Sequence, residues 1–285
     1  MISLTELTSV SISAVESVAD LIRSGVDADV SIETKSSPSD FVTEIDRTAE
    51  RCIVEHILAR VPDSTIVGEE GGVQGDGVVR WYVDPIDGTG NFAAGLPYFS
   101  TSVGVAVNGS LVGGAVHDPL RRETFAYTDD GVSLNGCTLS PSTPTDKGPG
   151  IILTSAITQL ARHAPDLAGR VASLAPSNHV HRDPGSFALQ LSHLASGRAS
   201  IAFELDASPW DICAGVALLR AANCQFVPLA DADEQDGPWA SRMFVAARAG
   251  VEIGPIVEVL LAVQDVLGEL PSLQLHAALA SVLET

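Results

Sequence analysis

No apolar run in this 285-residue sequence approaches the roughly 20 residues that a membrane-spanning helix requires. The first residues, Met1-Ile-Ser-Leu-Thr-Glu, lack the basic segment and apolar stretch of a secretory signal, so we do not expect secretion. Cysteine is also scarce: the four cysteines are scattered, and no two have CxxC spacing. This pattern argues against a disulfide scaffold and a zinc site, and it favours reduced thiols in the cytoplasm.

Basic residues are few as well. The chain has 16 Lys and Arg against 36 Asp and Glu, which gives a net charge of −20 at pH 7. Such a surface repels nucleic acid phosphates and anionic membranes, so we expect neither as a partner. It would also repel a phosphorylated metabolite unless bound cations reverse the local sign.

The chain does have enough apolar residues for a sizeable core. A hydrophobic content of 45% with 25 glycines fits an α/β or α+β enzyme better than a disordered chain. The length allows one large domain or two intimately packed ones of roughly 100–150 residues each. Residues 140–150 are rich in Pro, Ser and Thr and are the candidate boundary, which divides the chain into residues 1–145 and 146–285.

The stretch Trp81-Tyr-Val-Asp84-Pro-Ile-Asp87-Gly-Thr-Gly-Asn91-Phe is the most informative part of the sequence. Its first apolar residues indicate a buried strand, which we expect to stop at Asp84 because Pro85 cannot donate to a ladder. Asp87 then opens a turn, and Thr89 begins a helix whose first amides have no intrahelical acceptor. Two carboxylates beside such amides can hold divalent cations next to an anion, although a plain Asp-capped turn is the alternative.

Three other acids occupy comparable positions. Asp46 lies in the first turn of a predicted helix over residues 43–60, and Asp211 lies in the first turn of a helix opened by Ser208-Pro. Glu69 follows a predicted strand over residues 64–68. Each acid has a simpler explanation as a helix-dipole complement or a charged turn. However, acids at the ends of neighbouring strands can converge on one point.

Periodicity and turn signals predict the remaining elements. Helical spacing predicts further helices over residues 3–24, 158–174, 185–196, 212–222 and 253–267. Runs rich in β-formers predict strands over residues 102–107, 111–116, 123–128, 151–154 and 201–204. Asn108-Gly is a strong hairpin signal between the first two strands, and residues 131–136 contain another turn.

These motifs resemble the inositol monophosphatase family, within the lithium-sensitive, magnesium-dependent phosphatase superfamily. The resemblance runs from about Lys35 to Asn223 and rests on four motifs: Asp40-Phe-Val-Thr-Glu-Ile-Asp46, Gly68-Glu-Glu70, Asp84-Pro-Ile-Asp-Gly-Thr89 with Asn91-Phe92, and Trp210-Asp211-Ile-Cys-Ala-Gly215. It implies an α+β fold, a layered αβαβα sandwich of the sugar-phosphatase type with two intimately packed subdomains.

The resemblance also implies a role for each acid. Two to three Mg²⁺ ions would be held by Glu69, Asp84, the Ile86 carbonyl, Asp87 and Asp211. Such all-oxygen ligands suit Mg²⁺. Asp46 would hydrogen-bond Thr89, and this pair would take a proton from the attacking water. Phosphate oxygens would be held by the backbone amides of Gly88, Thr89 and Gly90.

By the same resemblance, the substrate would be held by Asp87, Gly185, Ser186, Phe187 and Glu204. A carboxylate such as Glu204 suits a polyol because it can accept two hydroxyl protons. Two residues depart from the family pattern: Gly90 loosens the helix start, and Phe187 narrows the polyol pocket. The scheme needs no histidine, so His117, His179 and His181 are expected to be structural.

The sequence thus predicts a phosphoric monoester hydrolase that acts on a small polyol phosphate resembling inositol 1-phosphate. The same chemistry could act on fructose 1,6-bisphosphate, histidinol phosphate or a 3′-phosphonucleotide, although no basic patch for a second phosphate is evident. A non-catalytic regulatory relative is the alternative of another class, and it predicts a decayed set of acids. The family is often dimeric, so the expected partners are a phosphorylated metabolite and a second copy of the chain.

Overall fold

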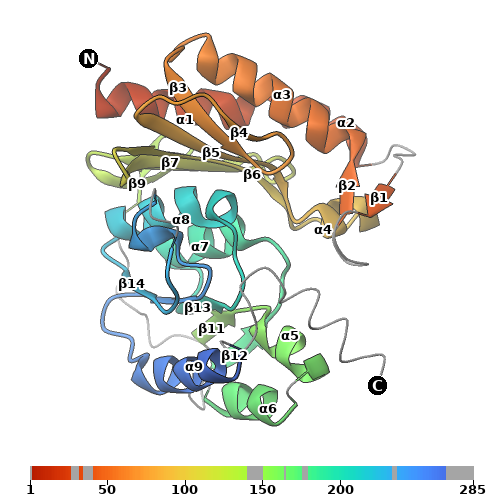
Figure 1. Ribbon diagram of the computed structural model, residues 1–285, viewed down its shortest axis with the longest axis vertical. Coiled ribbons are helices and arrows are strands. Elements are labelled where there is room, and N and C mark those ends of the chain that lie inside the picture. The colour runs from red at the N-terminus through yellow and green to blue at the C-terminus, as the bar shows by residue number, and fades with distance from the viewer. Residues whose placement is uncertain are drawn as a thin grey trace.

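The computed structural model describes residues 2–26, 32–34, 41–139, 150–163, 165–174, 179–232 and 236–267. Helices and sheets alternate in five layers, with two sheets separated by a middle layer of helices (Figure 1). The predicted αβαβα sandwich is therefore confirmed.

The first layer contains α1 (Leu4–Ser17), α2 (Ala19–Gly25) and α3 (Glu44–Leu58). The short strands β1 (Ile32–Thr34) and β2 (Phe41–Thr43) lie between α2 and α3 in the chain. A capping box of Ser3 and Glu6 starts α1. The single helix predicted over residues 3–24 is wrong, because the backbone leaves the helical region at Val18. The apolar spacing in the sequence continues across this break, because both helices bury apolar residues in one core.

The first sheet has eight strands in the order β10-β9-β8-β7-β6-β5-β3-β4. Their bounds are β3 Ser64–Gly68, β4 Gly72–Gln74, β5 Val79–Asp87, β6 Ser100–Val107, β7 Ser110–Asp118, β8 Glu123–Thr128, β9 Gly131–Leu134 and β10 Cys137–Thr138. The predicted hairpin between β6 and β7 is confirmed: Asn108 and Gly109 have φ of 51° and 75°, as a type I′ turn requires.

The predicted end of β5 at Asp84 is wrong. The strand continues to Asp87, which pairs with Ser100 after a register irregularity between Asp84 and Asp87. Such a bulge accommodates Pro85, which has no amide to donate to the ladder. The chain then turns into the short helix α4 (Thr89–Ala94).

The middle layer consists of α7 (Phe187–Ala195) and α8 (Pro209–Ala221). Every residue from Ile212 to Leu219 is buried, because α8 packs against the first sheet and lies beside α7 in the same layer (Figure 1). The helix predicted over residues 185–196 begins two residues later, since Gly185 has a φ of +85°.

The second sheet has the order β12-β11-β13-β15-β14, with β11 Gly150–Leu153, β12 His179–Arg182, β13 Ile201–Glu204, β14 Gln225–Pro228 and β15 Phe244–Ala247. Below it lie α5 (Ala156–His163), α6 (Pro165–Ser173) and α9 (Gly254–Leu267), and the 3₁₀ turn η1 (Pro238–Ala240) precedes β15. The single helix predicted over residues 158–174 is wrong: α6 begins anew at Pro165, which lacks the amide that a continuous helix needs.

The predicted boundary at residues 140–150 falls outside the described residues except for Gly150, so the division at residue 145 stays a prediction. Within the described residues, no helix has both the length and the apolar character needed to cross a membrane.

Candidate metal and phosphate site

Two parallel strands bring the first acids together. β3 and β5 are neighbours, with Gly68 opposite Val83. The Glu69 amide donates to the Val83 carbonyl at 3.1 Å, which fixes Glu69 beside the start of the Asp84 segment. Glu69 is close enough to Asp84 for its charge to raise the pKa of that carboxyl group.

Asp84, Asp87 and Asp211 form a cluster in which one carboxylate oxygen from each lies within 4.8 Å of the others. Asp84 and Asp87 are 2% and 6% exposed. Asp211 comes from the first turn of α8, where its carboxylate accepts from the Ser208 amide at 2.7 Å. Asp84 Oδ1 is buried and has no hydrogen-bond partner among the described residues.

The carboxyl groups of this cluster disfavour one another's ionisation. Burial, followed by the charges of Glu69, Asp87 and Asp211, raises the pKa of Asp84 well above its ordinary value. Burial and nearby carboxylates raise the pKa of Asp211 in the same way. Burial raises the pKa of Asp87 to about 6, although several hydrogen bonds to its carboxylate oppose the shift. Such a cluster is costly to ionise unless a cation compensates it.

The residues present fit magnesium. The cluster offers only oxygen ligands, which Mg²⁺ prefers, and the buried Asp84 oxygen has no partner in the part of the chain that the structure describes. The Ile86 carbonyl, the other predicted ligand in this segment, accepts a hydrogen bond from Thr89 at 3.0 Å.

The predicted pair of Asp46 and Thr89 is in hydrogen-bond contact. Thr89 Oγ1 lies 3.2 Å from Asp46 Oδ1. Asp46 is fully buried, and its other oxygen accepts from the amide and hydroxyl of Thr43, so the capping box of α3 holds this carboxylate in place. Burial raises the pKa of Asp46.

Two glycines let the loop before α4 meet the loop before α7. Gly88 has a φ of +96°, and a Cβ there would lie 2.9 Å from the carbonyl oxygen of Gly185. Asn91 Nδ2 donates to the carbonyls of Tyr98 and Pro184, each at 2.7 Å. The predicted phosphate-holding segment, Gly88 to Gly90, is thereby fixed against Gly185.

The other predicted substrate contacts are engaged within the protein. Glu204 ends β13 and is 1% exposed, and its carboxylate accepts from the Ser155 amide, at 3.0 and 3.1 Å, and from the Ser155 hydroxyl. Burial raises its pKa to about 8. The Ser186 hydroxyl and the Phe187 amide donate to Asp87.

Sequence reasoning missed Glu50. This α3 residue is 4% exposed and accepts from the amides of Glu70 and Gly71 at 2.8 and 2.6 Å, so it holds the turn that carries Glu69. The available signal was its spacing: it follows Asp46 by one helical turn and interrupts an apolar stripe.

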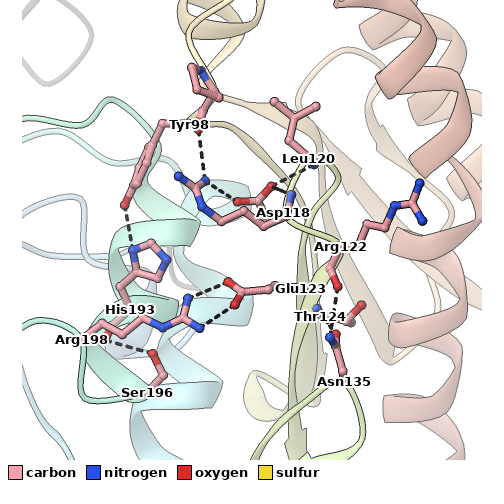
Figure 2. A network of polar contacts seen from close by, with 12 residues as sticks. Tyr98, Asp118, Leu120, Arg122, Glu123, Thr124, Asn135, His193, Ser196 and Arg198 are labelled. Carbon is pink, nitrogen blue, oxygen red and sulfur yellow. Dashed lines mark hydrogen bonds and ion pairs between the residues drawn. The ribbon is translucent and has the colours of Figure 1, made fainter.

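A cavity of about 480 Å³ beside residues 182–184 was also missed. Figure 2 shows three of its lining residues, Tyr98, His193 and Arg198. Arg198 makes two hydrogen bonds of 2.6 Å with Glu123, and His193 lies 3.2 Å from the Tyr98 hydroxyl. Another lining residue, Arg121, pairs with Asp118 at 2.7 Å. Because Arg121 and Arg198 are matched by acids and Arg182 donates to the His181 carbonyl at 2.7 Å, the cavity is not an evident site for a second phosphate. Of the histidines expected to be structural, His117 is buried and contacts Thr124 at 2.9 Å.

Known proteins resemble this chain over most of its length. The Inositol monophosphatase family matches residues 3–263. The Nus factor SuhB of Escherichia coli (strain K12) is 34% identical over 221 residues, which cover 76% of this chain and 83% of that protein.

Solved structures show the same fold. The IMPase of Thermotoga maritima superposes with a TM-score of 0.76 at 29% identity, covering 92% of this chain and 100% of that one. The extragenic suppressor protein suhB of Bartonella henselae has a TM-score of 0.76 at 23% identity, covering 90% and 98%. The chain belongs to the inositol monophosphatase family.

Proposed function

We propose that the protein is a magnesium-dependent phosphatase that hydrolyses the phosphate monoester of a small polyol, such as inositol 1-phosphate. The observation that carries this proposal is the cluster of Asp84, Asp87 and Asp211, whose carboxyl groups resist ionisation and include a buried Asp84 oxygen with no partner among the described residues. Two or three Mg²⁺ ions, held with the help of Glu69 and the Ile86 carbonyl, would supply Lewis-acid activation and charge neutralisation when bound.

The chain's own residues would provide positioning and proton transfer. Thr89 would pass a proton from the attacking water to Asp46, whose raised pKa makes it a better base at neutral pH than an ordinary aspartate. The amides of Gly88, Thr89 and Gly90 would orient the phosphate for displacement by water. Water attack releases inorganic phosphate and the alcohol, and it needs no covalent phosphoenzyme.

The substrate class is proposed from the family. Polyol hydroxyls would donate to Glu204 and contact Gly185 and Phe187, and the larger Phe187 would favour a narrower substrate than inositol itself. The remaining candidates are fructose 1,6-bisphosphate, histidinol phosphate and a 3′-phosphonucleotide. We also propose a homodimer, and the four free cysteines support a reducing compartment such as the cytoplasm.

A second candidate function follows from the names of the relatives. SuhB is named as a Nus factor and not as an enzyme, so this chain could serve as a regulatory protein that binds a partner. The sequence retains every acid that the family scheme requires, and three of them are clustered. This favours the catalytic proposal, because a binding role alone does not require such a cluster.

A panel of esters tests both proposals. Inositol 1-phosphate, fructose 1,6-bisphosphate, histidinol phosphate and a 3′-phosphonucleotide are compared by kcat/KM with and without Mg²⁺ and Li⁺. We expect Mg²⁺-dependent release of phosphate, fastest from a polyol monophosphate. A clear preference for a bisphosphate would change the substrate assignment, and no turnover of any ester would favour the regulatory role.

A further inference from the structure

Asp87, the last residue of β5, is held mainly by residues at the start of α7 in the middle layer. Its Oδ2 accepts from the Ala188 amide at 2.7 Å and from the Ser186 hydroxyl, and its Oδ1 accepts from the Phe187 amide at 3.0 Å. Ser100 of β6 adds a longer contact of 3.4 Å. These α7 donors are about 100 residues away in sequence, so Asp87 joins the end of β5 to the start of α7.

The start of α7 lacks a local cap. Ser186 is at the N-cap position, but its side chain makes no capping bond and the first turn of the helix contains no acid. A serine in this position normally accepts from an amide of its own helix. Here Asp87 accepts from those amides instead, and the serine hydroxyl donates to Asp87. The same carboxylate therefore caps a helix and belongs to the acidic cluster.

We infer that Ser186 is a positioning residue, which orients the Asp87 carboxylate for metal binding and so couples the docking of α7 to the metal site. A carboxylate fixed by three donors cannot rotate away from the cluster. Hydrogen bonds that orient a ligand carboxylate commonly change metal affinity or activity by about 10–100-fold. This inference rests on the metal site of the proposed function, and it does not require a particular substrate.

This role differs from the substrate contact that family resemblance implies for Ser186. A serine hydroxyl has one proton, and in this structure that proton goes to Asp87. The residue is also fully buried, so a substrate would reach it only by displacing its neighbours. The two roles predict different experimental results: positioning affects metal affinity, whereas substrate contact affects KM at saturating metal.

The test measures binding of Mn²⁺, a paramagnetic ion that accepts the same oxygen ligands, by electron paramagnetic resonance, with Mg²⁺ as competitor. Ser186→Ala is compared with Ser186→Thr, which keeps the hydroxyl. The matched control is Ser192→Ala on the same helix. The Ser192 hydroxyl is equally buried, and among the described residues it bonds only the Ala188 carbonyl, at 2.8 Å.

We expect Ser186→Ala to weaken metal binding by about 10–100-fold, Ser186→Thr to restore most of it, and Ser192→Ala to leave it unchanged. Melting of the metal-free variants shows whether both alanine variants are folded and comparably stable. Equal metal affinity in wild type and Ser186→Ala would overturn the inference, and so would a rise in ester KM alone. A wild-type protein that binds no metal would overturn it as well.

The outcome separates this inference from the proposed function. If the wild type binds metal, loses affinity in Ser186→Ala and hydrolyses no ester, the positioning role holds and the phosphatase proposal fails. If esters are hydrolysed and Ser186→Ala has wild-type metal affinity, the phosphatase proposal holds and the positioning role fails.

Discussion

Asp84 differs from the other buried carboxylates of the site in what surrounds its oxygens. Asp46 and Glu204 accept from the backbone amides of Thr43 and Ser155, and Glu50 accepts from two amides. Asp84 Oδ1 receives no hydrogen bond from the described residues and faces other acids. A buried carboxylate oxygen that receives no hydrogen bond and faces other acids is stable only if the group is protonated or neutralised by a cation. Asp84 is therefore the residue whose replacement gives the clearest test of metal binding.

Asp84→Asn should abolish Mg²⁺-dependent turnover, with a loss of more than about 100-fold. The loss should be this large because the charge removed belongs to the acidic cluster itself, and not to a residue that only orients a metal ligand. The metal-free variant should melt no lower than the wild type, since the substitution also removes repulsion between carboxylates. Phosphate release at saturating Mg²⁺ and calorimetric melting in EDTA measure the two effects. Wild-type turnover in this variant would contradict the assignment.

Glu50→Gln should weaken the turn that carries Glu69. The amide side chain offers one acceptor oxygen in place of two, so the Glu70 or Gly71 amide loses its partner. We expect a loss of about 1–3 kcal/mol in the free energy of unfolding and a higher Mg²⁺ requirement. Urea unfolding and a Mg²⁺ titration of activity measure these effects. The matched control is Glu55→Gln, an exposed position on the same helix, and equal behaviour of the two variants would contradict the role of Glu50.

At this scale the sequence predicted the acids and one pairing, that of Asp46 with Thr89, but not the other partners of these acids. Asp84, Asp87 and Asp211 were found because they lie in contiguous motifs that place acids at strand ends and helix starts. The cap that Asp87 provides to α7 joins residues 100 positions apart, and no local pattern reports such a contact. Glu50 was missed because its spacing after Asp46 indicates a buried position but does not show that it binds the backbone amides of Glu70 and Gly71.

The short helix α4 shows how an element is fixed from both ends. Gly88 precedes it with a φ of +96°, and Gly95 follows it with a φ of +71°. Nothing lies within 4 Å of a Cβ at Gly95, whereas a Cβ at Gly88 meets the carbonyls of Gly185 and Tyr98. The two glycines therefore share the same backbone requirement and differ only in tertiary contact.

Gly95→Ala should cost about 1–2 kcal/mol of stability, the penalty of a left-handed alanine, and leave the metal requirement unchanged. Gly88→Ala should cost more than this and also reduce kcat/KM, because relief of the clash separates the start of α4 from Gly185. Thermal melting and ester kinetics of both variants test the difference. Equal losses of stability and activity in the two variants would show that the contact with Gly185 has no separate role.

Element prediction succeeded where local signals were strong. The Asn108-Gly109 turn and the bounds of β3, β8 and β13 agree with the sequence patterns. β12, β14 and β15 were not predicted, because no short turn connects any of them to the strand beside it, so no hairpin signal reports the pairing. The helix breaks at Val18 and before α6 were hidden because the apolar spacing continues across them.

At the scale of the whole molecule, the acidic cluster lies where the layers meet. Its members come from the end of β5 in the first sheet and the start of α8 in the middle layer, while the start of α7 holds Asp87. This placement keeps several carboxylates out of water in a protein whose net charge is already −20. The stability of the metal-free fold should therefore depend on pH, in a direction set by the raised pKa values.

Raised carboxyl pKa values make the folded state hold protons that the unfolded state has released. The pKa of Glu204 is raised to about 8, and those of Asp84 and Asp211 lie well above 3.8. The free energy of unfolding should then fall as pH rises, by about 2 kcal/mol from Glu204 alone between pH 6.5 and 8. Below pH 6.5 the trend is opposed by histidines with lowered pKa values: His56, His117, His181 and His193.

Melting between pH 6.5 and 8 tests this dependence. In EDTA the melting temperature should fall as pH rises, and Glu204→Gln should flatten the slope because the amide does not titrate. Saturating Mg²⁺ should oppose the fall, since a cation bound by the cluster favours the ionised carboxylates and stabilises the fold more at higher pH. A melting temperature in EDTA that stays level or rises across this window would mean that the buried carboxyl groups are ionised without metal, and that their charges are compensated by the protein itself.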